Sequence, residues 1–357
     1  MRRRRVRATA AAAALITGAC SLPARADADQ ALAAFKAGRY LEAVAEIQAV
    51  VDRTPGYDYG YFLLGHCMLK MRRAGEAQLQ FRRALSLDPT RPEYYEGFAL
   101  ALNATGNWPL MIRAASDGLA RATDPRTRYV FLVLRGYAWS ALRRWNAAVR
   151  DLEEAQRIRS EPWVLVFLGR ARFALGAWAD ALPPLRKALE AVPDDPVVLR
   201  LLAESSLRLA ADERDAIRKR FTYTQTLIYA QRLASVSPDD LDAVNLVGRA
   251  ALGAGKLAQA ENVFRHSLSK NPRQCYTLAN LGRTYMAAAR WAEAEAYLRN
   301  ASACAPRLAT VYESLGELYL ELGKPQEAAA AFGRAEEIEP TRIAPDPVAA
   351  IPVFQPR

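Results

Sequence analysis

The apolar residues of this chain recur at a helical spacing and not at the alternate positions of a strand. From Asp27 onward no segment alternates apolar and polar residues as a half-buried strand does. Nearly all of that sequence reads instead as short amphipathic helices, many of which end at a proline. The pattern therefore predicts an all-helical protein.

The prolines that end these helices recur at a fixed period. Intervals of 34 residues separate Pro55 from Pro89 and run through Pro238, Pro272, Pro306 and Pro340. Pro193 lies 104 residues after Pro89, which is three periods plus two residues. It lies 45 residues before Pro238, which is one period plus eleven. The chain is therefore an array of repeats with one insertion.

Residues at fixed places inside each period agree with this array. A glycine stands 24 residues before its proline at Gly65, Gly169, Gly248, Gly282 and Gly316. Glycine inside a helix costs about 1 kcal/mol relative to alanine, so its recurrence indicates a close approach of a second helix. That second helix supplies a small, a large and again a small residue. The three sets are Ala77, Ala181, Ala260, Ala294 and Ala328; Phe81, Leu185, Phe264, Leu298 and Phe332; and Ala84, Ala188, Ser267, Ala301 and Ala335. We expect contacts between small residues to bring the helices together, and the large residues to fill the space against the next repeat.

This pattern resembles the tetratricopeptide repeat family, whose repeat length is 34 residues. The resemblance covers nearly the whole chain after its N-terminal segment and implies an all-α fold, a right-handed α-solenoid of antiparallel helix hairpins. The register gives nine repeats, which start near residues 24, 58, 92, 129, 162, 196, 241, 275 and 309.

The repeats also predict the domain organisation. Solenoid repeats contact their neighbours and share one core, so residues 27–342 are expected to form one elongated domain. The sixth repeat carries the eleven extra residues, which we place at 211–226 as a charged extension. Residues 343–357 are rich in proline and are expected to be a C-terminal tail, with Val353 and Phe354 available to cover the last repeat.

The N-terminus has the features of an export signal. Residues 1–7 carry five arginines and no acid, and an uncharged run follows from Ala8 to Ala19, too short to span a bilayer. An A-x-A cleavage sequence ends at Ala26, so residues 1–26 are interpreted as a signal peptide. The segment before Cys20 also resembles a lipoprotein box, in which Cys20 would be lipidated. The expected location is the periplasm, or alternatively the outer membrane as a lipoprotein that faces the periplasm.

This interpretation changes the meaning of the charge. The 357 residues include 49 Lys+Arg and 38 Asp+Glu, a formal net charge of +11. Residues 1–26 contain six arginines and no acid, so their removal leaves 43 basic residues and a net charge of +5. The basicity of the whole chain invites a nucleic-acid partner, but more than half of it belongs to the export signal.

Few residues suit catalysis. The sequence has no P-loop, no G-x-S-x-G and no C-x-x-C, and its two histidines are His66 and His266. Glu313, Glu317 and Glu321 lie four residues apart on one helix face, which is typical of a solvated surface. No enzymatic activity, cofactor or metal is expected.

Two of the four cysteines are expected to lie close together. Cys275 begins the first helix of the eighth repeat, and Cys304 ends its second helix. These ends are adjacent in an antiparallel hairpin, and an exported protein meets an oxidising compartment. A disulfide is therefore predicted, and the alternative is that both are small buried residues. Cys67 has no evident partner.

The resemblance also implies where a partner binds. In this family the first helices line a concave groove, and the matching positions here carry aromatic, Arg and Asn side chains. They are Tyr59, Phe62, His66, Tyr137, Trp163, Arg170, Phe173, Arg200, Asn245, Arg249, Asn280 and Arg283. Arg249, Arg283, Asn245 and Asn280 partly match a carboxylate clamp, although the expected lysines are absent.

The predicted function is an exported scaffold that binds an extended or helical protein segment. Its expected setting is the assembly of an envelope, secretion, pilus or polysaccharide-export machinery. The alternative is a non-catalytic accessory subunit that presents substrate to a separate envelope enzyme. No nucleic acid is expected as a partner, and the outer membrane is expected only if the chain is lipid-anchored.

Overall fold

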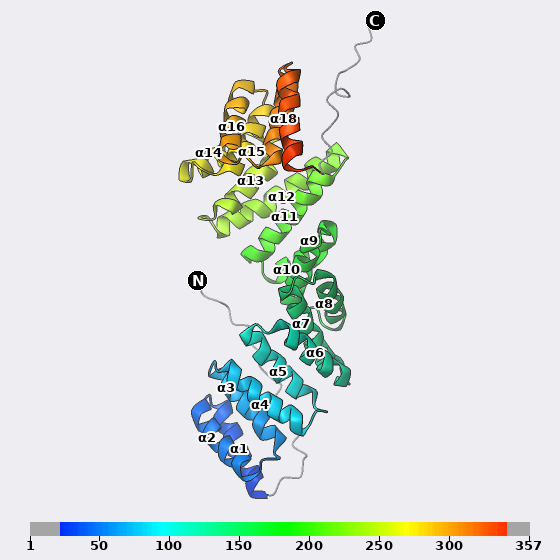
Figure 1. Ribbon diagram of the computed structural model, residues 1–357, viewed down its shortest axis with the longest axis vertical. Coiled ribbons are helices and arrows are strands. Elements are labelled where there is room, and N and C mark those ends of the chain that lie inside the picture. The colour runs from blue at the N-terminus through cyan, green and yellow to red at the C-terminus, as the bar shows by residue number, and fades with distance from the viewer. Residues whose placement is uncertain (1–21, 341–357) are drawn as a thin grey trace. The chain divides into compact units, whose positions relative to one another are not determined.

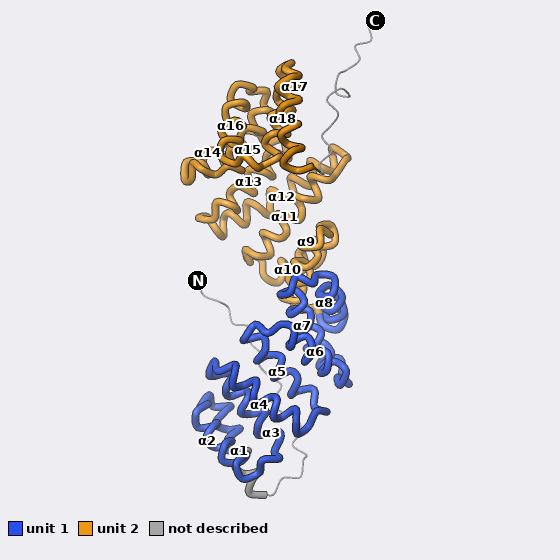
Figure 2. Tube along the Cα trace, viewed as in Figure 1, with its two compact units in different colours: residues 1–159 blue, residues 160–357 orange. Residues whose placement is uncertain are grey.

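The structure is a computed structural model that describes residues 22–340, a range that holds eighteen helices and no strand (Figure 1). The helices form nine consecutive antiparallel hairpins. They divide into two compact units, with the boundary between Arg159 and Ser160 (Figure 2). The all-α repeat fold predicted from the sequence is confirmed.

The first unit contains four hairpins. Its helices are α1 (Leu22–Lys36), α2 (Tyr40–Arg53), α3 (Asp58–Lys70), α4 (Ala74–Leu87), α5 (Pro92–Thr105), α6 (Trp108–Arg121), α7 (Pro125–Ala141) and α8 (Trp145–Ile158). The predicted signal peptide and Cys20 lie largely outside the described residues, and α1 begins inside the range 1–26.

The second unit contains five hairpins. Its helices are α9 (Pro162–Ala174), α10 (Trp178–Ala191), α11 (Pro196–Asp212), α12 (Ala216–Val236), α13 (Leu241–Gly253), α14 (Leu257–Lys270), α15 (Cys275–Ala287), α16 (Trp291–Cys304), α17 (Ala309–Glu321) and α18 (Pro325–Ile338). The predicted tail with Val353 and Phe354 lies outside the described residues.

Most first helices begin where the repeat register places them. The exception is α7, which begins at Pro125, four residues before the predicted start near 129. The reason is local, because proline suits the first turn of a helix and the Asp124 side chain accepts a hydrogen bond from the backbone N–H of Thr127.

The turn inside each ordinary hairpin needs one residue with a positive φ. Gly106 occupies this position after α5 with a φ of 72°, while Ala289 occupies it after α15 with a φ of 55°. Glycine adopts this backbone without a Cβ penalty, whereas alanine pays for it. The sixth hairpin, α11–α12, has no such residue and turns through residues 213–215.

The recurring glycines pack differently from the sequence prediction. A Cβ on Gly65 would lie 2.7 Å from the ring of Phe81, so the glycine makes room for the large residue of the second helix and not for the small Ala77. Gly97 of the next repeat faces the same ring. Phe81 is therefore held between two glycines, one from each repeat, because a flat ring can approach a backbone that has no side chain.

The core includes the three predicted sets of second-helix residues together with apolar residues of the first helices, such as Leu64 and Leu102. Ala77, Ala260 and Ser267 are fully buried, as are Phe81 and Phe264. Polar side chains occupy the opposite faces of these helices. The repeats thus share a continuous core inside each unit, as expected for stacked hairpins.

The arrangement of the helices defines an inner side in each unit. Successive first helices touch one another: α1, α3, α5 and α7 do so in the first unit, and α9, α11, α13, α15 and α17 in the second. No second helix of the described chain comes equally close to another second helix. The first helices therefore lie on the inside of the curve, and their exposed residues form a surface that we call the first-helix face.

The sixth hairpin is longer than the others. Helix α11 has 17 residues and α12 has 21, while α13, α15 and α17 have 13 each. The extra residues predicted at 211–226 thus lengthen the end of α11 and the start of α12, so the connection between these two helices lies farther out than in the other hairpins. Ile217 and Phe221 lie on this extension and are 82% and 63% exposed.

Candidate functional site

Aromatic side chains occupy the first-helix face of the first unit. The ring centroids of Tyr59 and Phe62 lie 5.6 Å apart, and those of Phe62 and His66 lie 4.5 Å apart. His66 also contacts Phe81 edge-on at 5.2 Å. All three groove residues predicted here are half-buried, so they form one packed ladder along α3 with a limited exposed surface.

His66 is neutral in this setting. Burial, and secondarily the nearby Lys70, lower its pKa from 6.5 to about 4. The imidazole therefore contributes an uncharged ring to the ladder at neutral pH and carries no general-acid role there.

The lowered pKa makes the first unit sensitive to acid. His66 takes up a proton near pH 6.5 in the unfolded chain but only near pH 4 in the folded chain. Protonation therefore favours the unfolded chain, so the unfolding free energy is unaffected by the titration of His66 above pH 6.5 and decreases as the pH falls from 6.5 toward 4. We expect the wild type to lose about 2–3 kcal/mol more unfolding free energy between pH 7 and 4.5 than His66→Phe does. Urea titrations of both proteins at the two pH values measure the difference. Equal losses would contradict the assignment.

The other predicted aromatic residues are also half-buried. Tyr137 on α7 contacts Trp108 at a centroid distance of 5.7 Å. In the second unit Trp163 contacts Phe167 at 6.1 Å, and Phe173 packs against the core of its own unit. These residues give the first-helix face an apolar component.

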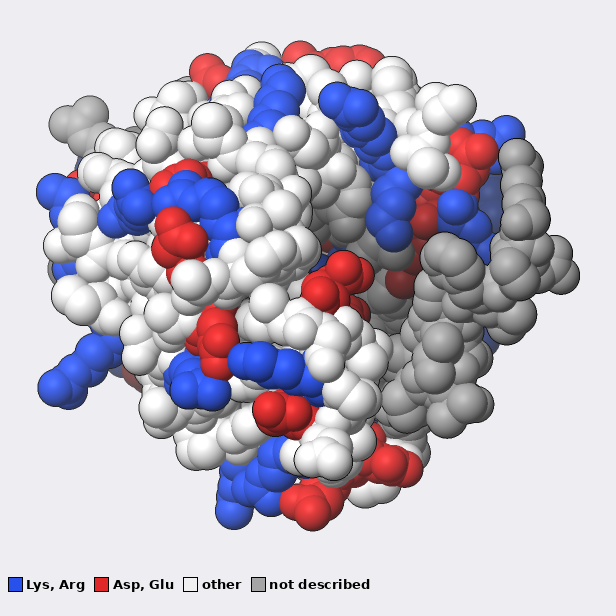
Figure 3. All heavy atoms as spheres, turned by 90° about the horizontal axis from the view of Figure 1, so that it is seen from above, with Lys and Arg blue, Asp and Glu red and all other residues white. Residues whose placement is uncertain are grey.

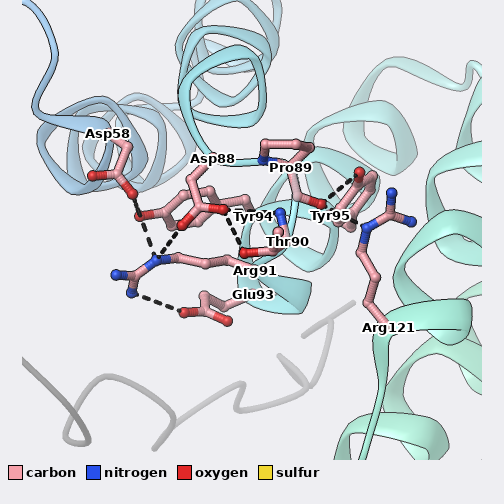
Figure 4. A network of polar contacts seen from close by, with 9 residues as sticks. All are labelled: Asp58, Asp88, Pro89, Thr90, Arg91, Glu93, Tyr94, Tyr95 and Arg121. Carbon is pink, nitrogen blue, oxygen red and sulfur yellow. Dashed lines mark hydrogen bonds and ion pairs between the residues drawn. The ribbon is translucent and has the colours of Figure 1, made fainter. Parts of the chain in front are cut away.

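A polar network joins the second and third repeats (Figure 4). The Tyr94 hydroxyl donates to Asp58 Oδ2 at 2.6 Å, and Arg91 Nε lies 3.0 Å from Asp88 Oδ2 and 3.5 Å from Asp58 Oδ2. Burial and the hydrogen bond to Asp58 raise the pKa of Tyr94 far above its ordinary value. The network fixes the α4–α5 connection and thus the position of α5 beside α3.

The same connection is held from its other side. Tyr95 and Arg121 both donate to the carbonyl oxygen of Pro89, at 3.1 and 2.6 Å (Figure 4). Because one carbonyl accepts both bonds, α5 and α6 are tied to the same point of the loop. These contacts are structural and did not figure among the predicted site residues.

A shallow hollow opens on the first-helix face of the second unit. It has a volume of about 340 Å³ and is lined by Arg170, Pro196, Val197, Arg200, Leu201, Ser237 and Asp240. Arg200 forms an ion pair with Asp240 and so is already partnered, whereas Arg170 is exposed. The hollow combines an apolar wall with one available cation.

Arginines gather beyond this hollow. Arg249 on α13 keeps an exposed surface, but partial desolvation of its guanidinium lowers its pKa. Arg208 and Arg283 lower this pKa further, while Glu204 raises it. None of these three arginines forms an ion pair within residues 22–340. We call Arg208, Arg249 and Arg283 the arginine cluster.

Two neighbours of the cluster were not predicted. Burial raises the pKa of Glu204, while Arg200, Arg249 and Arg208 lower it. Burial also raises the pKa of Tyr223, while Arg283 and Arg249 lower it. Arg200, Glu204 and Arg208 stand four residues apart and so share one face of α11, which is a signal that the sequence did carry. Tyr223 could not be found this way, because it belongs to the inserted part of α12.

The two predicted asparagines do not act together with the cluster. Asn245 donates to Gln274 Oε1 at 2.9 Å, and Ser267 and Thr277 donate to the same oxygen at 2.9 and 2.7 Å. This network joins α13, α14 and α15. Asn280 is half-buried on α15. The partial match to a carboxylate clamp is thus weakened, because the amide of Asn245 is already engaged.

The charge of the face reverses at α17. Burial, and then Glu313, raise the pKa of Glu317, while Arg283 lowers it. Seen from above, the molecule carries basic and acidic side chains interspersed on that side (Figure 3). A ligand of the second unit therefore meets cations over α11–α15 and carboxylates at α17.

The predicted cysteine pair is bonded in the structure. Cys275 and Cys304 form a disulfide across the start of α15 and the end of α16, with their Cα atoms 5.5 Å apart. Neither cysteine is fully buried, whereas Cys67 is a buried free thiol.

Within the described residues no group of His, Cys, Asp and Glu could hold a metal ion. No helix there is both long and apolar enough to span a membrane.

The comparisons with known proteins agree with the repeats. Tetratricopeptide repeat family models match residues 59–91 and 273–339. A search of the curated proteins finds no significant relative.

The fold occurs in a solved structure. The C-terminal part of a TPR repeat-containing protein from Cytophaga hutchinsonii is 17% identical, covers 71% of this chain and 99% of its own, and has a TM-score of 0.55. A tetratricopeptide repeat protein from Parabacteroides merdae is 13% identical, with coverages of 74% and 99% and a TM-score of 0.48. The matched repeats, the nine helix hairpins and the likeness to the Cytophaga structure show that the chain is a tetratricopeptide repeat protein.

Proposed function

We propose that this protein is a scaffold that binds an acidic segment of a partner protein on the first-helix face of its second unit. Tetratricopeptide repeat proteins in general bind protein partners. The observation that carries the proposal is the arginine cluster, in which Arg208 lowers the pKa of Arg249 more than Glu204 raises it and none of the three arginines forms an ion pair within residues 22–340.

The crowding of the arginines is unfavourable in the free protein. Burial and the neighbouring arginines lower the pKa of Arg249 in spite of the opposing effect of Glu204, which means that its charged form is destabilised. A carboxylate that docks among Arg208, Arg249 and Arg283 would relieve this repulsion and form charge-assisted hydrogen bonds. The hollow beside Arg170 offers apolar contact to the same segment. The face thus favours an acidic segment with an apolar residue.

We further propose that the scaffold works in the cell envelope, in the assembly of a secretion, pilus, polysaccharide-export or outer-membrane system. The disulfide between Cys275 and Cys304 supports an oxidising compartment. The arginine-rich N-terminus with its A-x-A sequence supports export to the periplasm. A periplasmic location and a lipid anchor at Cys20 are both compatible with these observations.

Binding of charged peptides tests the proposal directly. Three fluorescent twelve-residue peptides, acidic, neutral and basic, share a central leucine and are titrated with the full chain. We expect the acidic peptide to bind best, and Arg249→Glu/Arg283→Glu to weaken it about tenfold or more, since each tenfold corresponds to about 1.4 kcal/mol.

A matched variant separates the site from the overall charge. Arg186 and Lys187 are exposed on α10, a second helix, and their replacement by glutamate changes the net charge by the same amount. This control is expected to retain wild-type affinity at 150 mM salt, where the Debye length is about 8 Å. Equal weakening by both double variants, or preference for the basic peptide, would refute the proposed site.

A further inference from the structure

The extension of the sixth hairpin carries an apolar stripe. Ile217, Phe221 and Ile228 on α12 are 82%, 63% and 53% exposed. Together with Thr224 they are spaced by four, three and four residues, which places them on one side of a helix. The stripe is thus a continuous feature of α12.

No element within residues 160–340 covers this stripe. The buried residues of α12 are Thr226, Leu227, Ala230 and Leu233, and they lie on the opposite side of the helix. Ile217 and Phe221 stand in its first two turns, beyond the length of an ordinary hairpin. Burying such large apolar side chains is favourable, so their exposure indicates a binding surface.

Exposed cations flank the stripe. Arg218 and Arg220 stand on either side of it, and Arg214 lies in the preceding turn. None of the three forms an ion pair among the described residues.

The carboxylates of this segment are engaged with the backbone or face another way. Glu213 accepts from the backbone N–H groups of Arg214 and Asp215, and Asp215 accepts from the N–H of Arg218. The charge of Asp212 raises the pKa of Tyr223, a residue on the opposite side of α12. The outward side therefore presents apolar residues between cations.

We propose that this stripe is a peripheral binding surface for an anionic lipid bilayer. Apolar side chains flanked by arginines are the composition of helices that lie in the headgroup region, with their apolar residues inserted and their cations near lipid phosphates. A partner helix is the competing occupant. A coiled coil with a partner helix would have a stripe sustained over three to four heptads, whereas this one ends after four positions. The proposal concerns a different surface from the arginine cluster and does not depend on it.

Vesicle binding tests the inference. Full-length protein is sedimented with vesicles of phosphatidylglycerol and phosphatidylethanolamine (30:70) and, separately, of phosphatidylcholine. Ile217→Ser/Phe221→Ser is expected to lower the apparent affinity for the anionic vesicles about tenfold. The control is Leu41→Ser/Leu79→Ser, which removes two similarly exposed leucines, 73% and 61%, from helices α2 and α4. It is expected to bind as the wild type does.

A second readout reports on the stripe alone. The N-terminal arginines are common to all variants, so bulk binding includes any contribution they make. In Phe221→Trp, quenching of the added indole by brominated acyl chains shows insertion at this position, after subtraction of the wild-type signal. Leu79→Trp is expected to show no added quenching. Absence of quenching at position 221, or a stripe variant that binds as tightly as wild type, would overturn the proposal. So would a stripe that captures a protein helix while leaving vesicles unbound.

Discussion

Replacement of Asp151 by asparagine is expected to lower the unfolding free energy of the first unit by about 3–5 kcal/mol. Asp151 on α8 is buried, with a side chain 9% exposed, and both of its oxygens accept bonds of 2.8 Å from Arg135 of α7. Arg135 also donates to Ser116 on α6 at 3.1 Å. The side chain of Arg135 is 23% exposed, so loss of the carboxylate leaves a largely desolvated guanidinium without its partner.

Urea unfolding followed by circular dichroism measures this effect. Asp117→Asn on α6 is the control, because Asp117 is exposed and forms no ion pair within the described residues, and its cost is expected to stay within about 0.5 kcal/mol. Arg135→Met/Asp151→Leu removes both charges and is expected to recover most of the loss, since apolar pairs often replace buried ion pairs without a penalty. A single substitution that costs less than about 1 kcal/mol would show that the pair is well solvated.

The second large effect is expected at Phe264, whose replacement by alanine should cost the second unit about 3–5 kcal/mol. The ring is fully buried on α14 and occupies the space left by Gly248 on α13. Alanine would leave a cavity there that a helix pair cannot close without displacing both backbones.

The chain itself supplies the control for this substitution. Leu185 and Leu298 occupy the matching positions of other repeats and pack against Gly169 and Gly282. Phe264→Leu is therefore expected to cost no more than about 1.5 kcal/mol. Thermal unfolding of the three proteins gives the order, and equal destabilisation by alanine and leucine would contradict the packing described for this glycine.

Most of the fold could be predicted because the repeat period constrains it many times over. The glycines and the small and large residues of the second helices mark five of the nine hairpins, and Phe81 and Phe264 are buried as expected. The register did not predict the start of α7, which depends on a local cap at Asp124. The register also did not show that each glycine faces the large residue of the second helix. Residue spacing shows which residues share a side of a helix, but it does not show which of them contacts the neighbouring helix.

The functional residues were harder to predict. Family positions included Arg249 and Arg283, but the third member of the cluster, Arg208, is residue 13 of α11 and was not among the residues expected from the sequence. Asn245 stands at an expected position yet is engaged by Gln274, which is 29 residues away. The Arg135–Asp151 pair likewise joins residues 16 apart in sequence. Such partners depend on how one helix rotates against the next, which spacing does not fix.

The contacts between successive first helices have a mechanical consequence. Within each unit, neighbouring first helices abut while second helices are separated from one another by first helices. Compression of the inner side would push the first helices into steric repulsion, whereas the second helices on the outer side can move apart with less resistance. Each unit should thus flex as a stiff inner edge with a compliant outer one. The contacts of a bound segment with the first helices would thus keep a nearly constant spacing while the second helices move relative to one another.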